Sequence, residues 1–462
     1  MIGGVAASRF RKIHFVGIGG AGMNGIAEVL HAHGFVVSGS DARESETLNR
    51  LAGLGITVHV GHSAEWVKDV DLVVYSSAVP KDNPERLAGV ERGIPVIRRA
   101  EMLGELMRLK YSIAVAGTHG KTTTTSMIGQ IWNQAELRPT IIVGGIVDRL
   151  GGGAQYGDSD FLIAEADEYD RSFLEMNPSV AVLTNVDADH LDCYGDISEI
   201  RKAFVTFANK IPFYGYAAAC IDDPGVREVV PKLRRRVVTY GVSPQAEYRA
   251  VDIRPEGEKT SFGLVVRGEA RGEIVLGVPG RHNVLNALAA VAVSTEEGVA
   301  LETVRTALAQ FAGVRRRFER KGSANGVEVF EDYAHHPKEA EATLAAARDN
   351  WPGRRIVVLF QPHLFTRTRD QADAFGSVFL GCDLLLLAPV YPAREAPIPG
   401  VTSALVADAA RRRGHRQVVE LSSKEEAVAV LKEKTKPGDL VIVMGAGDVG
   451  RMSMPIVESL GK

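Results

Sequence analysis

Short apolar runs alternate with helix-like segments through most of the chain, and this alternation limits the possible fold more than any other feature. The pattern is typical of βαβ units, in which parallel strands are joined by helices. The sequence therefore predicts an α/β protein. At roughly 150 residues per domain, a chain of 462 residues suggests about three domains.

The apolar runs fall into three sets, which define three expected domains at 1–109, 110–315 and 316–462. The first set predicts a helix over 23–33 and strands at 13–16, 35–38, 56–60, 72–75 and 95–97. The second predicts strands at 113–116, 140–143, 161–164 and 180–183, antiparallel strands within 245–278 and a helix over 283–295. The third predicts strands at 327–330, 356–360, 384–388 and 440–444.

Composition narrows the class of protein. The net charge is −3, so the sequence predicts no nucleic-acid partner. The cysteines, Cys193, Cys220 and Cys382, are far apart and form no CxxC pair, which indicates neither a disulfide scaffold nor a zinc site. The first residues contain no apolar signal core, and no apolar run approaches the length of a membrane span. We therefore expect a cytoplasmic protein that does not interact with membranes.

A glycine-rich loop follows the first apolar run. Gly17, Gly19 and Gly22 match the G-x-G-x-x-G spacing, and Asp41 stands at the end of the next expected strand. This arrangement is typical of a site for NAD, FAD or another nucleoside diphosphate on a helix N-terminus. The alternative is a tight turn without a ligand. Residues 445–450 have the same spacing, and there we interpret the glycines as a turn.

A second loop, residues 117–122 (GTHGKT), follows the run 112–116. It is shorter than a Walker A loop, because Val115 stands where the first glycine would fall. Its backbone N–H groups could still face phosphate oxygens, with Lys121 neutralising charge and the Thr122 hydroxyl binding Mg²⁺. The strand–glycine–lysine–helix context predicts a nucleoside triphosphate site.

Acidic and histidine clusters follow other apolar runs. Glu165 ends one run and is either a metal ligand or a solvated strand end. His190 stands among three carboxylates and is as readily a loop residue as a ligand, since Mg²⁺ prefers oxygen. The clusters 331–337 and 361–369 could hold a small zwitterion. Alternatively, they pack between domains.

Nine segments together resemble, in order, the Mur ligase family. They are 14–28, 117–125, 165–174, 184–195, 280–290, 313–319, 332–337, 361–370 and 444–449. The resemblance covers essentially the whole chain. It implies a Rossmann-like N-terminal domain for a UDP-sugar, a central P-loop ATPase domain and a Rossmann-like C-terminal domain. The two glycine loops would then serve two different nucleotides.

The resemblance also implies an activity. This is ATP-dependent ligation of L-alanine to the lactyl carboxylate of UDP-N-acetylmuramate through an acyl phosphate, with ATP and Mg²⁺ as cofactors, by a monomer or homodimer. The runner-up in the family attaches a whole tripeptide to the same UDP-sugar, but its first loop lacks the GGAGMNG of residues 19–25. Outside the family, the first loop alone would suit an NAD-dependent oxidoreductase. The second loop alone would suit a non-catalytic nucleotide-binding switch.

The family's site residues map onto this sequence as follows. The UDP-sugar would contact Gly17, Gly19, Gly20, Ala21, Gly22, Met23, Asp41, His62 and Ser77. ATP would contact Gly117, Thr118, His119, Gly120, Lys121, Thr122, Thr123, Asn283, Arg317, Asp332 and His336. L-Alanine would contact Tyr333, His363 and Arg367. The metal ligands would be Thr122, Glu165 and His190, and the catalytic groups Lys121, Glu165, His190 and Arg317.

Three departures from the family pattern stand out. Tyr169 replaces a common serine, and Glu331 replaces an aspartate. Leu364-Phe365 stands where Arg-Tyr is common, which affects the expected amino-acid pocket. Residues 203–207 contain no lysine, so we expect no carbamylated lysine of the kind that the sister ligases carry.

Overall fold

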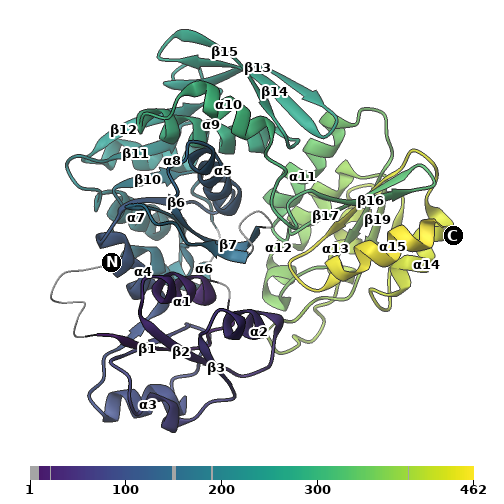
Figure 1. Ribbon diagram of the computed structural model, residues 1–462. Helices are drawn as coiled ribbons and strands as arrows, with labels where there is room; N and C mark the ends of the chain where they lie inside the picture. Colours follow the sequence, from purple (N-terminus) through teal and green to yellow (C-terminus); the bar gives the residue numbers. More distant parts are fainter. Residues whose placement is uncertain (1–9, 21, 148–151, 189–190, 394, 462) are drawn as a thin grey trace. The chain divides into compact units, whose positions relative to one another are not determined.

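The computed structural model describes residues 10–20, 22–147, 152–188, 191–393 and 395–461 (Figure 1). Three mostly parallel sheets with helices between their strands confirm the predicted α/β class. The chain forms two compact units. Unit 1 contains residues 1–251, 263–274 and 285–310, and unit 2 contains residues 252–262, 275–284 and 311–462.

The first sheet is parallel, and in the described residues it has five strands in the order β3-β2-β1-β4-β5. Its strands are β1 (Lys12–Val16), β2 (Val36–Asp41), β3 (Thr57–Val60), β4 (Leu72–Tyr75) and β5 (Val96–Arg98). The helices beside it are α1 (Met23–Ala32), α2 (Glu46–Gly53), η1 (Ala64–Val67), α3 (Pro84–Glu91) and α4 (Arg99–Arg108). Strand order reverses at β1, between β2 and β4, and open α/β sheets commonly bind ligands at the carboxyl ends of the strands at such a point.

The second sheet has ten strands over the described part of the chain, in the order β15-β14-β13-β12-β11-β10-β6-β9-β7-β8. Its strands are β6 (Tyr111–Ala116), β7 (Thr140–Val147), β8 (Gly152–Gln155), β9 (Phe161–Ala166), β10 (Val180–Leu183), β11 (Tyr216–Cys220), β12 (Arg236–Gly241), β13 (Tyr248–Glu256), β14 (Lys259–Val266) and β15 (Glu269–Leu276). Its helices are α5 (Lys121–Gln134), η3 (Tyr169–Glu175), α6 (Leu191–Tyr194), α7 (Ile197–Ala208), α8 (Pro224–Val229), η4 (Val230–Lys232), α9 (Arg281–Glu296) and α10 (Leu301–Ala309).

The segment 245–278 forms β13, β14 and β15, which are neighbours in the sheet. Consecutive strands here are joined by only two residues. Such short connections are possible only between antiparallel strands, so the predicted antiparallel segment is confirmed.

The third sheet has six strands in the described ranges, in the order β16-β17-β21-β18-β19-β20. All neighbours are parallel except β16 and β17. Its strands are β16 (Glu319–Ala324), β17 (Val327–Asp332), β18 (Ile356–Phe360), β19 (Leu384–Leu387), β20 (Val418–Glu420) and β21 (Leu440–Met444). Its helices are α11 (Pro337–Asn350), α12 (Phe365–Val378), η5 (Phe379–Gly381), α13 (Ala404–Arg412), α14 (Glu426–Lys434), η6 (Val449–Met452) and α15 (Ser453–Leu460).

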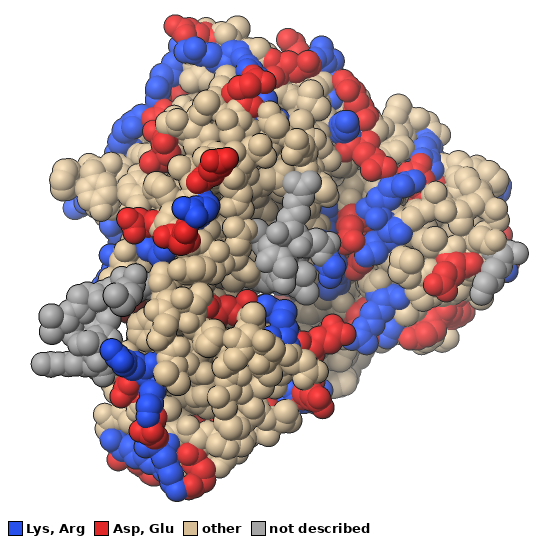
Figure 2. Space-filling view, viewed as in Figure 1, with Lys and Arg blue, Asp and Glu red and all other residues tan. Residues whose placement is uncertain are grey.

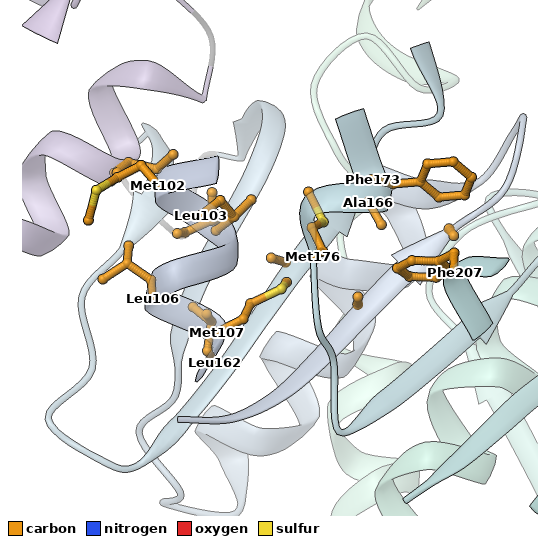
Figure 3. Packing of buried hydrophobic residues seen from close by; sticks show 14 of the residues in the cluster. Met102, Leu103, Leu106, Met107, Leu162, Ala166, Phe173, Met176 and Phe207 are labelled. Carbon is orange, nitrogen blue, oxygen red and sulfur yellow. The ribbon is translucent and has the colours of Figure 1, made fainter. Parts of the chain in front are cut away.

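Helix α4 connects the first sheet to the second within unit 1. Its buried side chains belong to one hydrophobic cluster with residues of β9, η3 and α7. Figure 3 shows part of this cluster, with Met107 of α4 beside Met176. A Cβ on Gly104 would lie 2.3 Å from the carbonyl oxygen of Glu175, so only glycine lets α4 approach this closely.

Charged side chains of both signs are interspersed on the face shown in Figure 2. Neither sign forms a continuous area there, in keeping with a net charge of −3. In the described ranges, every helix is too short or too polar to span a membrane.

Candidate active site

The first glycine loop leaves β1 and enters α1 at Met23, as the G-x-G-x-x-G pattern predicts. Gly17 has a φ of +80°, a left-handed backbone conformation that is strained for any residue with a side chain. The N–H groups of Gly17 and Ile18 donate to the Ser40 carbonyl at 2.8 and 2.9 Å. The N–H of Gly19 donates to Oδ2 of Asp41 at 2.9 Å. Asp41 therefore braces the loop itself, whereas contact with a ribose stays a prediction.

A buried carboxylate, Glu85, lies behind this loop. It accepts hydrogen bonds from the Ser40 hydroxyl at 2.6 Å and the Ser63 N–H at 3.1 Å. Nε2 of His14 and Nδ1 of His62 lie 3.7 and 3.3 Å from its Oε2. Burial alone would raise the pKa of Glu85, but the interaction with His14 and the hydrogen bonds from Ser40 and Ser63 together outweigh it and lower the pKa. His62, predicted to contact the UDP-sugar, is thus held by a residue that the sequence analysis did not identify.

The second glycine loop connects β6 to α5, as predicted. Gly117 and Gly120 have φ values of +148° and +81°. A Cβ on Gly117 would lie 1.9 Å from the Thr184 hydroxyl, and one on Gly120 would lie 2.5 Å from Oδ1 of Asn286. Because the loop opens directly into a 14-residue helix, it presents N–H groups and the positive end of the helix dipole to an anion.

Residues after β10 fasten this loop from its other side. The N–H of His119 donates to Oδ1 of Asn185 at 2.7 Å, and the Thr184 hydroxyl donates to the His119 carbonyl at 2.7 Å. The N–H of Asp187 donates to the Thr118 hydroxyl at 3.0 Å. The loop is therefore held in shape by groups of the protein itself, which is the preorganisation that phosphoryl transfer requires.

Lys121 lies partly buried beside the same loop, with 15% of its side chain exposed. Its ammonium donates to Oε2 of Glu168 at 2.7 Å and to the Gly117 carbonyl at 2.7 Å. Burial alone would lower the pKa of Lys121, but the charges of Glu168, Asp167 and Glu165 and the hydrogen bond to Glu168 together outweigh it and raise the pKa above its usual value. Lys121 is thus a positive charge held at the loop, and Glu168 is a partner that the sequence analysis left unassigned.

Oxygen donors suited to Mg²⁺ stand near the loop. Thr122 is in the first turn of α5, and Glu165 lies in β9 opposite Val115 of β6. Hydroxyl and carboxylate oxygens are the ligand types that Mg²⁺ takes. Across the residues that the structure describes, no group of three His, Cys, Asp or Glu side chains could hold a metal ion. His190, the third predicted ligand, and Ala21, predicted for the UDP-sugar, lie outside those residues.

Asp332, in unit 2, ends β17 and is buried. Its two oxygens accept hydrogen bonds from the N–H groups of Phe318 and Ala334, each at 2.7 Å. Burial raises its pKa to about 6, although the charge of Arg317 opposes the rise. His336 caps α11, and Asn283 donates to the Pro279 carbonyl at 2.7 Å.

An aromatic and histidine cluster lies at the carboxyl ends of β17 and β18 in unit 2. The rings of Tyr333 and His335 are 5.3 Å apart, and those of His335 and His363 are 5.7 Å apart. Tyr391 stacks on His363 at 5.7 Å. The structure thus brings together Tyr333 and His363, two of the three residues predicted for the amino acid. His335, which contacts both, lies in the predicted cluster 331–337 but was given no role of its own, and Tyr391 was not singled out in the sequence.

The third predicted residue, Arg367, is in the first turn of α12. Its neighbour Thr366 donates hydrogen bonds to the carboxylate of Glu395. Burial alone would raise the pKa of Glu395, but the bonds from Thr366 and the charge of Arg367 contribute to lowering it below its usual value. Leu364, one of the departures, precedes this helix with a φ of +69°, which is strained for leucine.

Family models for three Mur ligase domains match successive parts of the chain. The family's catalytic domain matches residues 12–111, its middle domain 115–294 and its glutamate ligase domain 316–447. A UDP-N-acetylmuramate--L-alanine ligase from Salinibacter ruber is 51% identical over 456 residues, or 98% of this chain and 96% of that protein. The chain belongs to the Mur ligase family.

Further Mur ligases agree with this assignment, and the predicted resemblance is confirmed. A UDP-N-acetylmuramate--L-alanine ligase from Geobacter sulfurreducens is 51% identical over 442 residues, 96% of each chain. Among solved structures, a UDP-N-acetylmuramate-alanine ligase from Thermotoga maritima has a TM-score of 0.81 at 30% identity, covering 97% of this chain and 98% of that one. A murein peptide ligase from Psychrobacter arcticus shares the fold, with a TM-score of 0.69 at 24% identity and coverage of 98% and 99%.

Proposed function

We propose that this chain is an ATP-dependent ligase that joins L-alanine to the lactyl carboxylate of UDP-N-acetylmuramate. The products are UDP-N-acetylmuramoyl-L-alanine, ADP and phosphate, and the reaction makes a peptidoglycan precursor. The observation that carries the proposal is 51% identity, over 98% of the chain, to a ligase named for this reaction. The braced phosphate loop with its partly buried lysine supports the ATP-dependent step.

The first step transfers a phosphoryl group. A lactyl carboxylate oxygen attacks the γ-phosphorus of ATP, the bond from that phosphorus to the bridging oxygen breaks, and ADP leaves. Lys121 and the loop N–H groups neutralise the charge that builds on the phosphoryl oxygens, and Arg317 is assigned the same role from unit 2. Thr122, Glu165 and His190 would hold Mg²⁺, which when bound adds charge neutralisation on the phosphates.

The second step forms the amide. The neutral amine of L-alanine attacks the acyl carbon, phosphate leaves with the bonding electron pair, and a base takes the proton from the nitrogen. Tyr333, His363 and Arg367 are assigned to L-alanine. The contacts among Tyr333, His335 and His363 support this assignment, because they form a polar, aromatic-lined group at the carboxyl ends of β17 and β18, the two strands that pair with β21.

The three segments have separate proposed roles. Residues 1–109 bind the UDP-sugar through Gly17, Gly19, Gly20, Ala21, Gly22, Met23, Asp41, His62 and Ser77. Residues 110–315 bind ATP through 117–123 and Asn283, and residues 316–462 contribute Asp332, His336 and the L-alanine contacts. The proposed location is the cytoplasm, as a monomer or homodimer.

Mass spectrometry of the product tests the proposal. The enzyme is incubated with ATP, Mg²⁺ and UDP-N-acetylmuramate, and with either L-alanine or the tripeptide L-alanyl-γ-D-glutamyl-meso-diaminopimelate. The expected product is the UDP-sugar carrying a single alanine. Efficient attachment of the tripeptide and none of alanine would assign the chain to the recycling ligases instead.

A further inference from the structure

The segment that enters the third sheet contains two residues with left-handed backbone conformations. Arg316 has a φ of +58° and Phe318 a φ of +49°, and neither is glycine. Such conformations are strained for residues other than glycine and persist only where surrounding contacts enforce them. The residue between them is Arg317, which the proposed function assigns to the γ-phosphate.

The side chain of Arg316 supplies much of that enforcement. Its Nε donates to Oε1 of Glu331 at 2.9 Å, and its Nη2 donates to the carbonyls of Gly445 and Gly447 at 2.7 and 2.9 Å. Its backbone N–H donates to Oε2 of Glu319 at 2.8 Å. A planar guanidinium can make these divergent bonds at once, and an ammonium cannot reproduce the fork.

The glycine loop 445–450, which we interpreted as a turn, fits this arrangement. A Cβ on Gly450 would lie 2.0 Å from Oε1 of Glu331, the oxygen that binds Arg316. A Cβ on Gly447 would lie 2.5 Å from the side-chain oxygen of Gln361. Because Gly447 and Gly450 have no side chains, the loop can lie close enough for the carbonyls of Gly445 and Gly447 to accept hydrogen bonds from Arg316.

Arg316 is also joined to the residues assigned to substrate. The N–H of Tyr333 donates to the Arg316 carbonyl at 2.7 Å. The guanidinium carbons of Arg316 and Arg317 lie 4.7 and 5.1 Å from the centre of the Tyr333 ring. Phe318 is anchored on the other side by its N–H bond to Asp332. Residues 316–318 therefore form a short arch. Arg316 and Phe318 are fixed at its two ends, and Arg317 lies between them.

We infer that Arg316 is a positioning residue for phosphoryl transfer: it clamps this arch to the 445–450 loop and so aims Arg317. The inference rests on the proposed function, because it takes the γ-phosphate as the target of Arg317. Arg316 itself is given no contact with substrate.

The first test compares Arg316→Ala, Arg316→Lys and the control Arg320→Ala in the full chain. Arg320 is an arginine of the same segment whose ion pairs, with Glu258 and Glu328, lie away from this arch. Arg316→Ala is expected to lower kcat for phosphate release about 100-fold, the cost of misplacing a reacting group by about 1 Å. The KM for UDP-N-acetylmuramate should be unchanged, and Arg316→Lys should restore only part of kcat. An unchanged kcat in both Arg316 variants overturns the inference.

A double-mutant cycle separates positioning from general support of the fold. If Arg316 acts through Arg317, adding Arg316→Ala to an Arg317→Lys protein should lower kcat much less than in the wild type. An equal loss in both backgrounds overturns the inference. If Arg317→Ala and Arg317→Lys keep wild-type kcat, it is the proposed role of Arg317 that fails. If Arg316→Ala proves unfolded in urea titration, Arg316→Lys carries the same cycle.

Discussion

Substituting Gly120 by alanine tests whether the shape of the phosphate loop, and not only its charge, supports ATP use. Gly120 has a φ of +81° at the start of α5. Gly298, elsewhere in unit 1, has a nearly equal φ of +83° with nothing within 4 Å of the added Cβ. Gly298→Ala is therefore a matched control for the backbone strain alone.

The expected cost follows from the contacts. Both variants incur the left-handed strain of an alanine, about 1–2 kcal/mol. In Gly120→Ala the new Cβ would also lie 2.5 Å from Oδ1 of Asn286, a buried oxygen that accepts from the Thr124 hydroxyl at 3.2 Å. If Asn286 moves away, the lost bond adds about 1–3 kcal/mol. Gly120→Ala should thus cost about 2–5 kcal/mol in total.

The two variants should differ more in kcat/KM for ATP than in their free energies of unfolding. A shift of the loop moves the N–H groups and Lys121 away from the phosphates, and misplacement of about 1 Å costs about 100-fold. We expect kcat/KM for ATP to fall by about that factor in Gly120→Ala and to stay near wild type in Gly298→Ala. Urea unfolding gives the stabilities, and phosphate release with varied ATP gives the kinetics. Equal kcat/KM in the two variants would refute the assignment of this loop to ATP.

Three further predictions follow from single side chains. Lys121→Ala should abolish phosphate release, while calorimetric titration should still show UDP-N-acetylmuramate binding, because the first loop belongs to a different sheet; loss of that binding in a folded variant would contradict two separate sites. Glu168→Gln should lower the free energy of unfolding by about 3 kcal/mol, because it removes the buried carboxylate that pairs with the partly buried Lys121 ammonium; an unchanged urea midpoint would show that the pair contributes nothing. The folded pKa of Asp332, about 6, lies above the ordinary 3.8, so the folded chain binds this proton more tightly than the unfolded chain. Relative to Asp332→Asn, the wild-type free energy of unfolding should therefore fall by about 3 kcal/mol as the pH rises from about 4 to 6, then stay level; parallel pH curves would contradict the raised pKa.

The sequence predicted most of the parallel strands that are rich in valine, isoleucine or leucine, but not β12 (RVVTYG) or β20 (VVE). It missed β11 (YAAAC), because alanine favours helices and nothing local marks a strand. In the structure β11 is fully buried between the parallel strands β10 and β12, so tertiary packing overrides the local preference. The prediction for 35–38 was too short, since β2 continues through small residues to Asp41. Gly39 is required there because a Cβ would lie 2.6 Å from Ile18.

The residues of the candidate site also divide into those that the sequence revealed and those that it did not. The two glycine loops were visible because their spacing and neighbouring elements are local features of the sequence. The groups that hold them are not local: Glu168 is 47 residues from Lys121, and Asn286 is 162 residues from Thr124. Their amide and carboxylate side chains resemble ordinary loop or helix residues until the fold brings them to the loop. Glu85 was missed for the same reason, because a lone glutamate in a helix gives no sign of being buried.

The central claim is that one chain uses ATP to join an amino acid to a UDP-sugar. The most direct measurement is phosphate release in the presence of ATP and Mg²⁺, with UDP-N-acetylmuramate and L-alanine added separately and together. The account predicts release only when both are present, with one phosphate for each alanine attached. Rapid release with ATP alone, or no release with all substrates and a folded enzyme, would contradict it.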